Sequence, residues 1–139
     1  MTEIDFYVLG DPAAGTRELV ACRLAAKAFS QGHRVLLHAA DAAQAQALDD
    51  LLWTFRDDAF LPHATLAADP DAPVLIGWGE EPATLPYLLV NLAATVPAFF
   101  SRFERVAEII SDEPAVRDAG RERFRFYRDR GYSLRTHKL

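Results

Sequence analysis

The chain has 139 residues, half of them hydrophobic and a quarter charged, a composition that excludes a disordered or membrane-spanning protein and predicts one folded domain over residues 1–139. No apolar run could cross a membrane, no signal-peptide pattern is present, and the single cysteine excludes an intrachain disulfide, so we expect a cytoplasmic protein. The net charge is −5, but residues 117–139 carry eight Lys/Arg against three Asp/Glu, which predicts a basic patch for an acidic peptide and little direct nucleic-acid binding by the acidic body.

Strands and helices alternate along the first two thirds of the chain. Short apolar runs predict buried strands over residues 4–9, 34–39, 73–78 and 87–92. Thr16 is a suitable N-cap for a helix that continues to about Ser30, and Gly32 is a suitable C′ residue. This alternation predicts an α/β fold with a mostly parallel or mixed sheet and helices on both faces.

A second helix is predicted after the second strand. Asp41 and Gln44 have the spacing of a capping box, which opens a helix that continues through Trp53. The following stretch, residues 55–66, mixes large apolar side chains with charged ones and is predicted to be irregular and exposed.

The last third of the chain is predicted to end in a basic helix. Residues 97–110 fit a short helix followed by a strand. The basic helix then begins at an N-cap of Asp112 or Glu113, has Pro114 in its first turn, and ends before Gly131. Its basic side chains recur at helical spacing and form one cationic stripe, made of Arg117, Arg121, Arg125 and Arg128. Arginines beside aromatic rings suit a short acidic segment that also carries an apolar side chain.

Residues 10–16, GDPAAGT, follow a predicted strand and open a predicted helix, which is the setting of a phosphate-binding loop. The lysine that such a loop places before its Ser/Thr is absent, so nothing in the loop neutralises the phosphates. We interpret the segment as a strand-to-helix turn. A degenerate nucleotide-binding protein or enzyme that uses this loop is the alternative hypothesis.

No other pattern predicts chemistry. The four histidines show no metal-ligand spacing, and the acidic pairs Asp57-Asp58 and Glu80-Glu81 are expected to be solvated loop residues. Cys22 lies inside an apolar helical pattern and is expected to be buried filler rather than a nucleophile. The sequence therefore predicts no catalytic residue, no metal and no cofactor.

Two candidate binding surfaces are left. One is the cationic stripe, for which a merely solvated helix face is the competing interpretation. The other is the apolar segment from Trp53 to His63, where Phe60 and Leu61 lie beside Pro62 and are hard to bury together. Such a segment indicates an interface.

Five stretches, in order and at matching spacing, resemble the chi subunit of bacterial DNA polymerase III holoenzyme, an accessory protein of the clamp loader. They are FYVL at 6–9, G-x-R-V-L at 32–36, LDDLLWTF and AFLPH within 48–63, PVLIGW at 73–78 and RERFRFYRDRGY at 121–132. The resemblance implies a single Rossmann-like α/β domain with a basic C-terminal helix and no catalytic activity of its own.

The resemblance also implies two partners. Chi-like proteins bind psi, a small subunit that tethers chi to the clamp loader, and the acidic C-terminal tail of single-stranded-DNA-binding protein, which ends in proline and phenylalanine. Carried over by motif, the tail site comprises Arg117, Arg121, Phe124, Arg125 and Ile110, and Arg121 is the candidate for holding the terminal carboxylate. The psi surface comprises Trp53, Phe60, Leu61, Pro62 and His63.

Three tail-site positions differ from those of some chi-like proteins. Arg117 and Arg125 stand where the family can carry lysine, which keeps the charge, and Phe124 stands where it can carry tyrosine, which removes a hydroxyl. Burial of one phenylalanine together with exposed ion pairs predicts an affinity on the order of micromolar that salt weakens. Direct DNA binding through the basic helix is a further alternative, from which we expect little.

Overall fold

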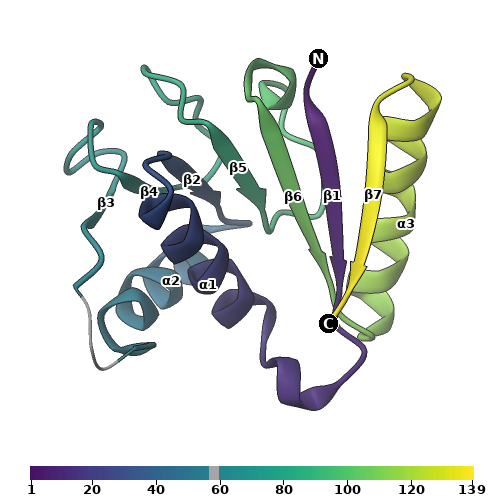
Figure 1. Cartoon of the computed structure of the whole chain (residues 1–139), viewed down its shortest axis with the longest axis horizontal. Coiled ribbons are helices and arrows are strands. Elements are labelled where there is room, and N and C mark those ends of the chain that lie inside the picture. The colour runs from purple at the N-terminus through teal and green to yellow at the C-terminus, as the bar shows by residue number, and fades with distance from the viewer. Residues whose placement is uncertain (57–59) are drawn as a thin grey trace.

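The computed structural model describes residues 1–56 and 60–139, and within them one parallel sheet carries helices on both faces (Figure 1). Its strands are β1 (Glu3–Val8), β2 (Val35–His38), β3 (His63–Thr65), β4 (Val74–Gly77), β5 (Leu88–Asn91), β6 (Arg105–Ile110) and β7 (Ser133–Lys138). Their order is β3-β4-β2-β5-β6-β1-β7, and every neighbouring pair is parallel. The predicted α/β, Rossmann-like architecture is confirmed.

Three α-helices cover the sheet. Helices α1 (Arg17–Ser30) and α2 (Ala42–Thr54) lie on one face and α3 (Pro114–Asp129) lies on the other, behind β7 (Figure 1). Two short 3-10 turns, η1 (Pro12–Ala14) and η2 (Phe100–Arg102), lie in the connections. None of the helices in the described part of the chain is long and apolar enough to cross a bilayer.

Local signals begin the first two helices where the sequence predicts. Thr16 Oγ1 accepts a hydrogen bond from the Leu19 N–H at 3.1 Å. The Asp41 carboxylate accepts from the Gln44 N–H at 2.8 Å, and the Gln44 side chain accepts from the Ala40 N–H at 2.8 Å. The capping pair is therefore reciprocal, but its second bond reaches one residue further back than in a standard capping box.

Two glycines end α1 and α3 as predicted. Gly32 and Gly131 have φ values of 79° and 81°, in the left-handed region that favours glycine. After α3, the Tyr132 N–H donates to the Tyr127 carbonyl at 3.1 Å, which closes the last turn and directs the chain into β7.

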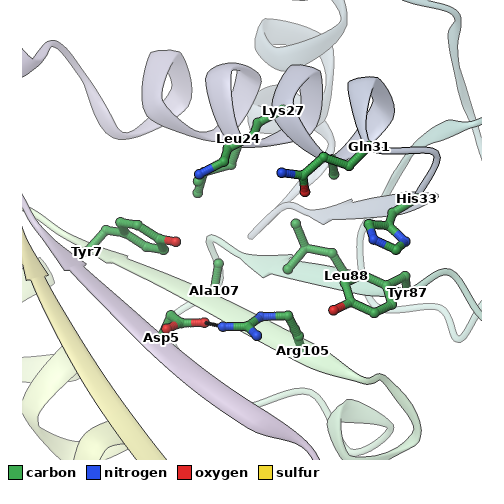
Figure 2. Close-up of a pocket in the computed structure, with 11 residues that line it drawn as sticks. Asp5, Tyr7, Leu24, Lys27, Gln31, His33, Tyr87, Leu88, Arg105 and Ala107 are labelled. Atoms are coloured by element: carbon green, nitrogen blue, oxygen red, sulfur yellow. Dashed lines mark hydrogen bonds and ion pairs between the residues drawn. The ribbon is translucent and has the colours of Figure 1, made fainter.

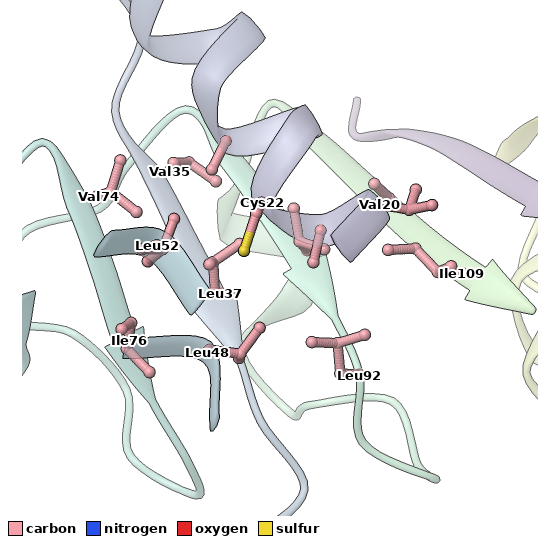
Figure 3. Close-up of a cluster of buried hydrophobic side chains, with 14 of the residues drawn as sticks. Val20, Cys22, Val35, Leu37, Leu48, Leu52, Val74, Ile76, Leu92 and Ile109 are labelled. Atoms are coloured by element: carbon pink, nitrogen blue, oxygen red, sulfur yellow. The ribbon is translucent and has the colours of Figure 1, made fainter. Parts of the chain in front are cut away.

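The core has two halves because successive strand residues point to opposite faces of the sheet. Figure 3 shows the half under α1 and α2, which includes Val20, Cys22, Val35, Leu37, Leu48, Leu52, Val74, Ile76, Leu92 and Ile109. Burial raises the pKa of the Cys22 thiol to about 12, and the prediction of a buried, unreactive cysteine is confirmed.

The other half of the core lies under α3 and is rich in aromatic rings. Tyr127 is fully buried and packs edge-to-face on Phe6 and Phe100, with ring centroids 6.0 and 5.3 Å apart. Such pairs add roughly 0.5–1.5 kcal/mol beyond the area they bury, so they hold α3 firmly on the sheet.

Two strands and one turn differ from the predictions. β3 lies in the stretch that was predicted to be irregular, and β7 was not predicted, since both are edge strands with few apolar residues. Their pairing with β4 and β1 depends on chain segments far away in the sequence. The short helix expected within residues 97–110 is the single 3-10 turn η2, and the strand after it, β6, is confirmed. The Asp57-Asp58 pair lies outside the described residues.

Candidate functional site

A buried polar cluster fixes the rotation of α3 on the sheet. Glu108 of β6 accepts hydrogen bonds from Arg123 Nε at 2.8 Å, from the Tyr127 hydroxyl at 2.7 Å and from Asn91 Nδ2 at 3.0 Å. Burial raises the pKa of the Glu108 carboxyl, whereas the Arg123 guanidinium and the two neutral donors act in the opposite direction. Because Arg123 and Tyr127 point inward, the opposite side of the helix, which carries Arg121, Arg125 and Arg128, is exposed.

The outward side chains form what we call the arginine face, made of Arg117, Arg121, Arg125 and Arg128. All four are exposed, with Arg121 at 64% of its side-chain surface. Each has a carboxylate neighbour on the same helix; Asp118, for example, lies 3.5 Å from Arg117 and 3.8 Å from Arg121. Exposed pairs of this kind contribute about 0–1 kcal/mol, so another carboxylate can replace Asp118 at low cost.

Apolar groups border the arginine face on its sheet side. Phe124 is half-buried and packs on Phe6 at 5.2 Å between ring centroids. Ile110, at the end of β6, is 8% exposed and reaches α3 at Gly120, where a Cβ would overlap the Ile110 Cδ1 methyl. The structure thus brings the five predicted tail-site residues to one flank of α3, with Ile110 presenting only its edge.

The second predicted surface lies at the end of α2 and the start of β3. We call it the aromatic patch, formed by Trp53, Phe60 and Pro62. Trp53 is 57% exposed and Phe60 66% exposed, and their ring centroids are 5.4 Å apart. Two large adjoining rings left in solvent are unusual for a monomeric surface and characterise protein interfaces.

Leu61 and His63 lie beneath the aromatic patch rather than on it. Leu61 is 1% exposed and belongs to the core under α1 and α2. The His63 side chain is also 1% exposed, donates from Nδ1 to the Leu61 carbonyl at 2.6 Å and packs edge-on against Trp53 at 4.6 Å. The buried position of Leu61 differs from the expectation that it is hard to bury, because its side chain enters the gap beside α2. Both residues position the exposed rings.

The patch has an acidic border. Asp49 lies 3.3 Å from His63 Nε2, without hydrogen-bond geometry, and Asp50 is exposed on the same helix. The two candidate surfaces are thus opposite in sign. They also lie at opposite edges of the sheet, beside β3 and behind β7 (Figure 1).

The loop from Gly10 to Thr16 does not form a phosphate cradle. Asp11 accepts from the Ala13 N–H at 2.9 Å, and its carboxylate lies with that of Asp112 around a hollow of about 200 Å³. Thr16 caps its own helix, and Arg17 is engaged by the Ile109 and Leu92 carbonyls at 2.9 and 3.3 Å. Carboxylates at a phosphate site repel the ligand, which supports the interpretation as a turn.

Sequence reasoning missed the residues that orient α3. Arg123 is 3% exposed, although it is one of eight basic residues after position 116. A detectable signal was Glu108, an acidic residue inside an otherwise apolar predicted strand, because a buried carboxylate needs a cationic partner. Nothing in the sequence indicated that position 120 requires a residue as small as glycine.

Comparisons with known proteins identify the family of the chain. The family model described as DNA polymerase III chi subunit, HolC, matches residues 1–135. The chain belongs to the DNA polymerase III chi subunit family. It is 50% identical to DNA polymerase III subunit chi of Pseudomonas aeruginosa over 139 residues, which cover 100% of this chain and 98% of that protein. It is 31% identical to the Escherichia coli subunit over 144 residues, 98% of this chain and 97% of that protein.

Membership of the chi family makes the chain an accessory subunit of the replicative DNA polymerase III. A solved structure, the crystal structure of T4 UvsW, matches 99% of the chain with a TM-score of 0.66 at 13% identity, and the chain spans 42% of that chain. At this identity the likeness shows the fold alone. Chi-family membership explains the motif order, but the positions of the surfaces come from the geometry above.

Proposed function

We propose that this chi-family chain is a non-catalytic adaptor of DNA polymerase III. It binds the psi subunit of the clamp loader through the aromatic patch, and the acidic C-terminal tail of single-stranded-DNA-binding protein through the arginine face. The psi subunit links it to the clamp loader, so the adaptor connects the replicase to coated single strands. Direct contact with nucleic acid is minor, because the protein is acidic overall and the arginine face is a local basic surface.

The observation that carries the tail assignment is the arginine face itself, a row of exposed guanidiniums beside two apolar side chains. Arg121 can hold the terminal carboxylate of the tail with two parallel hydrogen bonds after Asp118 is displaced. The terminal ring then packs against Phe124 and the edge of Ile110. Arg117 and Arg125 meet the acidic residues upstream.

The psi assignment rests on the aromatic patch. Trp53 and Phe60 already contact each other in a tilted arrangement, and Trp53 packs on His63, so few side-chain rotations are frozen when a partner binds. The acidic border at Asp49 and Asp50 favours a partner segment with basic residues around an apolar side chain.

An adaptor must hold both partners at once. We would titrate a fluorescent peptide that is acidic and ends in Pro-Phe into the free chain and into its complex with psi, and follow anisotropy. We expect equal affinities, because the surfaces lie at opposite edges of the sheet. Arg121→Ala should lose the peptide and keep psi, and Trp53→Ala should do the reverse. Displacement of the peptide by psi would contradict the adaptor function. Failure of the wild type to bind the peptide would mean that the arginine face is only a solvated helix surface.

A further inference from the structure

A groove that neither proposed surface uses follows the flank of α1. Two adjoining hollows of about 220 and 470 Å³ share Tyr7, Leu24 and Lys27 as lining residues. Together they extend along α1 from Val20 to Gln31, about 16 Å at 1.5 Å per residue. We call this feature the α1 groove. It opens toward β1 and β7, which carry no helix on this face (Figure 1).

One end of the α1 groove is polar. Figure 2 shows side chains from α1 and from the strands directed into the space between them. Among residues 1–56 and 60–139, no hydrogen-bond partner is found for the Tyr7 and Tyr87 hydroxyls, the Gln31 amide or Lys27 Nζ. Burial and the Asp5 charge raise the pKa of Tyr7, so its hydroxyl keeps its proton and can donate. This end therefore offers several polar groups that can donate hydrogen bonds, and among them Lys27 can only donate.

Two carboxylates line the groove, Asp11 at its apolar end and Asp5 at its polar end, and Asp5 is neutralised. Asp5, at its floor, accepts from Arg105 Nη2 at 2.6 Å and lies 2.9 Å from His137 Nε2 and 3.2 Å from Arg135 Nε. Burial alone would raise the pKa of Asp5, but these bonds and charges bring it below its ordinary value. Lys27, in contrast, has no ion pair within the described residues, so it places an unpaired positive charge at the polar end of the groove.

The other end of the groove is apolar. Val20, Leu24 and the partly exposed C-terminal Leu139 line it, with Ala13 and Ala14 of η1. Arg23 stands at its edge and donates to the Ala14 carbonyl at 2.9 Å. An occupant thus meets apolar surface at one end and, further along, a polar hollow that carries the Lys27 charge.

We propose that the α1 groove docks an acidic peptide segment of a further partner protein. The segment places a carboxylate at Lys27 and the Tyr7 hydroxyl, and a large apolar side chain between Leu24 and Leu139. Charge complementarity selects the acidic residue, and the open, elongated shape fits a chain rather than an enclosed small molecule. The arginine face lies on the opposite face of the sheet, so this site is independent of the tail site and of the proposed function.

In the test, a library of short random displayed peptides is selected for binding to the immobilised chain that carries Arg121→Ala. This substitution weakens the arginine face. Before each round, peptides that bind the chain carrying both Arg121→Ala and Lys27→Glu are removed from the library. We expect enriched peptides to combine Asp or Glu with a large apolar residue. Synthesised peptides should lose affinity about 10-fold or more with Lys27→Glu and with Leu139→Ser. Arg102→Glu, an exposed charge reversal on η2, should leave the affinity unchanged.

All three substitutions are on exposed side chains, and thermal unfolding checks that each variant is folded. Three outcomes would overturn the proposal: no enrichment beyond the depleted library, equal binding by the Lys27→Glu chain, or enrichment of apolar peptides without an acidic residue.

Discussion

The arginine face and the aromatic patch are two candidate binding surfaces that one fold exposes in different ways. The patch displays two rigid rings that rest on the buried Leu61 and His63. The arginine face displays four flexible cations whose helix is held from beneath by Glu108 and its partners. We infer that a rigid apolar surface gives tight binding with little salt dependence, whereas mobile charges give weaker, salt-sensitive binding.

The largest effect is expected from the contact that supports the arginine face from inside. Arg123→Met leaves Glu108 buried without its cation, so the free energy of unfolding should fall by about 3–5 kcal/mol in urea denaturation. The matched control is Arg121→Met, two residues away and exposed, for which a change within about 0.5 kcal/mol is expected. Similar stabilities of the two variants would mean that the buried cluster does not anchor α3.

The next effect concerns the aromatic patch. Trp53→Ala and Phe60→Ala should each weaken the complex with psi by about 2–4 kcal/mol, measured by calorimetry, because exposed aromatic anchors carry most of the binding energy of an interface. Phe29→Ala, which removes a partly exposed ring from α1, is the control and should retain psi. Unchanged psi affinity in both patch variants would place the psi surface elsewhere.

A smaller loss is expected at the arginine face. Arg121→Ala should weaken binding of the Pro-Phe-ended tail peptide by about 1.5–3 kcal/mol, since a charge-assisted bidentate contact is lost. Arg117→Ala and Arg125→Ala should each cost about 0–1 kcal/mol, as exposed ion pairs do. Arg130→Ala provides the control, because its guanidinium stacks over Phe126 at 3.6 Å on another part of the helix surface. Equal losses at all four positions would indicate a general charge effect without a defined carboxylate site.

Salt should separate the two surfaces without any substitution. Raising NaCl from about 50 to about 500 mM shortens the screening length, so the tail peptide should lose several-fold in affinity while the psi complex changes by less than about twofold. Parallel titrations of both partners measure this. A psi complex that is as salt-sensitive as the tail complex would show that its acidic border, rather than the rings, dominates binding.

The smallest effect is expected from pH. It concerns the stability of the whole fold and therefore both surfaces equally. Burial lowers the pKa of His38 below its ordinary value of 6.5, although the Asn91 hydrogen bond opposes this, so the unfolded chain takes up a proton that the folded chain does not. Stability is therefore full above about pH 6.5 and falls as the pH is lowered below it. Urea denaturation between about pH 7.5 and 5.5 should show the decrease, and His38→Gln should reduce it. An unchanged slope in that variant would assign the decrease to other groups.

The elements predicted correctly are those that depend on neighbours in the sequence. Thr16, Asp41, Gly32 and Gly131 mark helix ends because caps form within one helical turn. The buried strands were recognisable from continuous apolar runs, and the family motifs placed both candidate surfaces on the chain. These features could be read from composition, spacing and resemblance.

The remaining features depend on contacts between distant segments. β7 exists because β1 offers it an edge, and Arg123 differs from Arg121 only because Glu108 lies opposite it in space. Leu61 is buried and its neighbour Phe60 is exposed for a similar reason, since Leu61 belongs to the core that residues from distant segments form under α1 and α2. Helical spacing identified a row of arginines. The free energy of burying a charge, which depends on the partner that the fold supplies, separated the exposed arginines from the one that holds the helix in place.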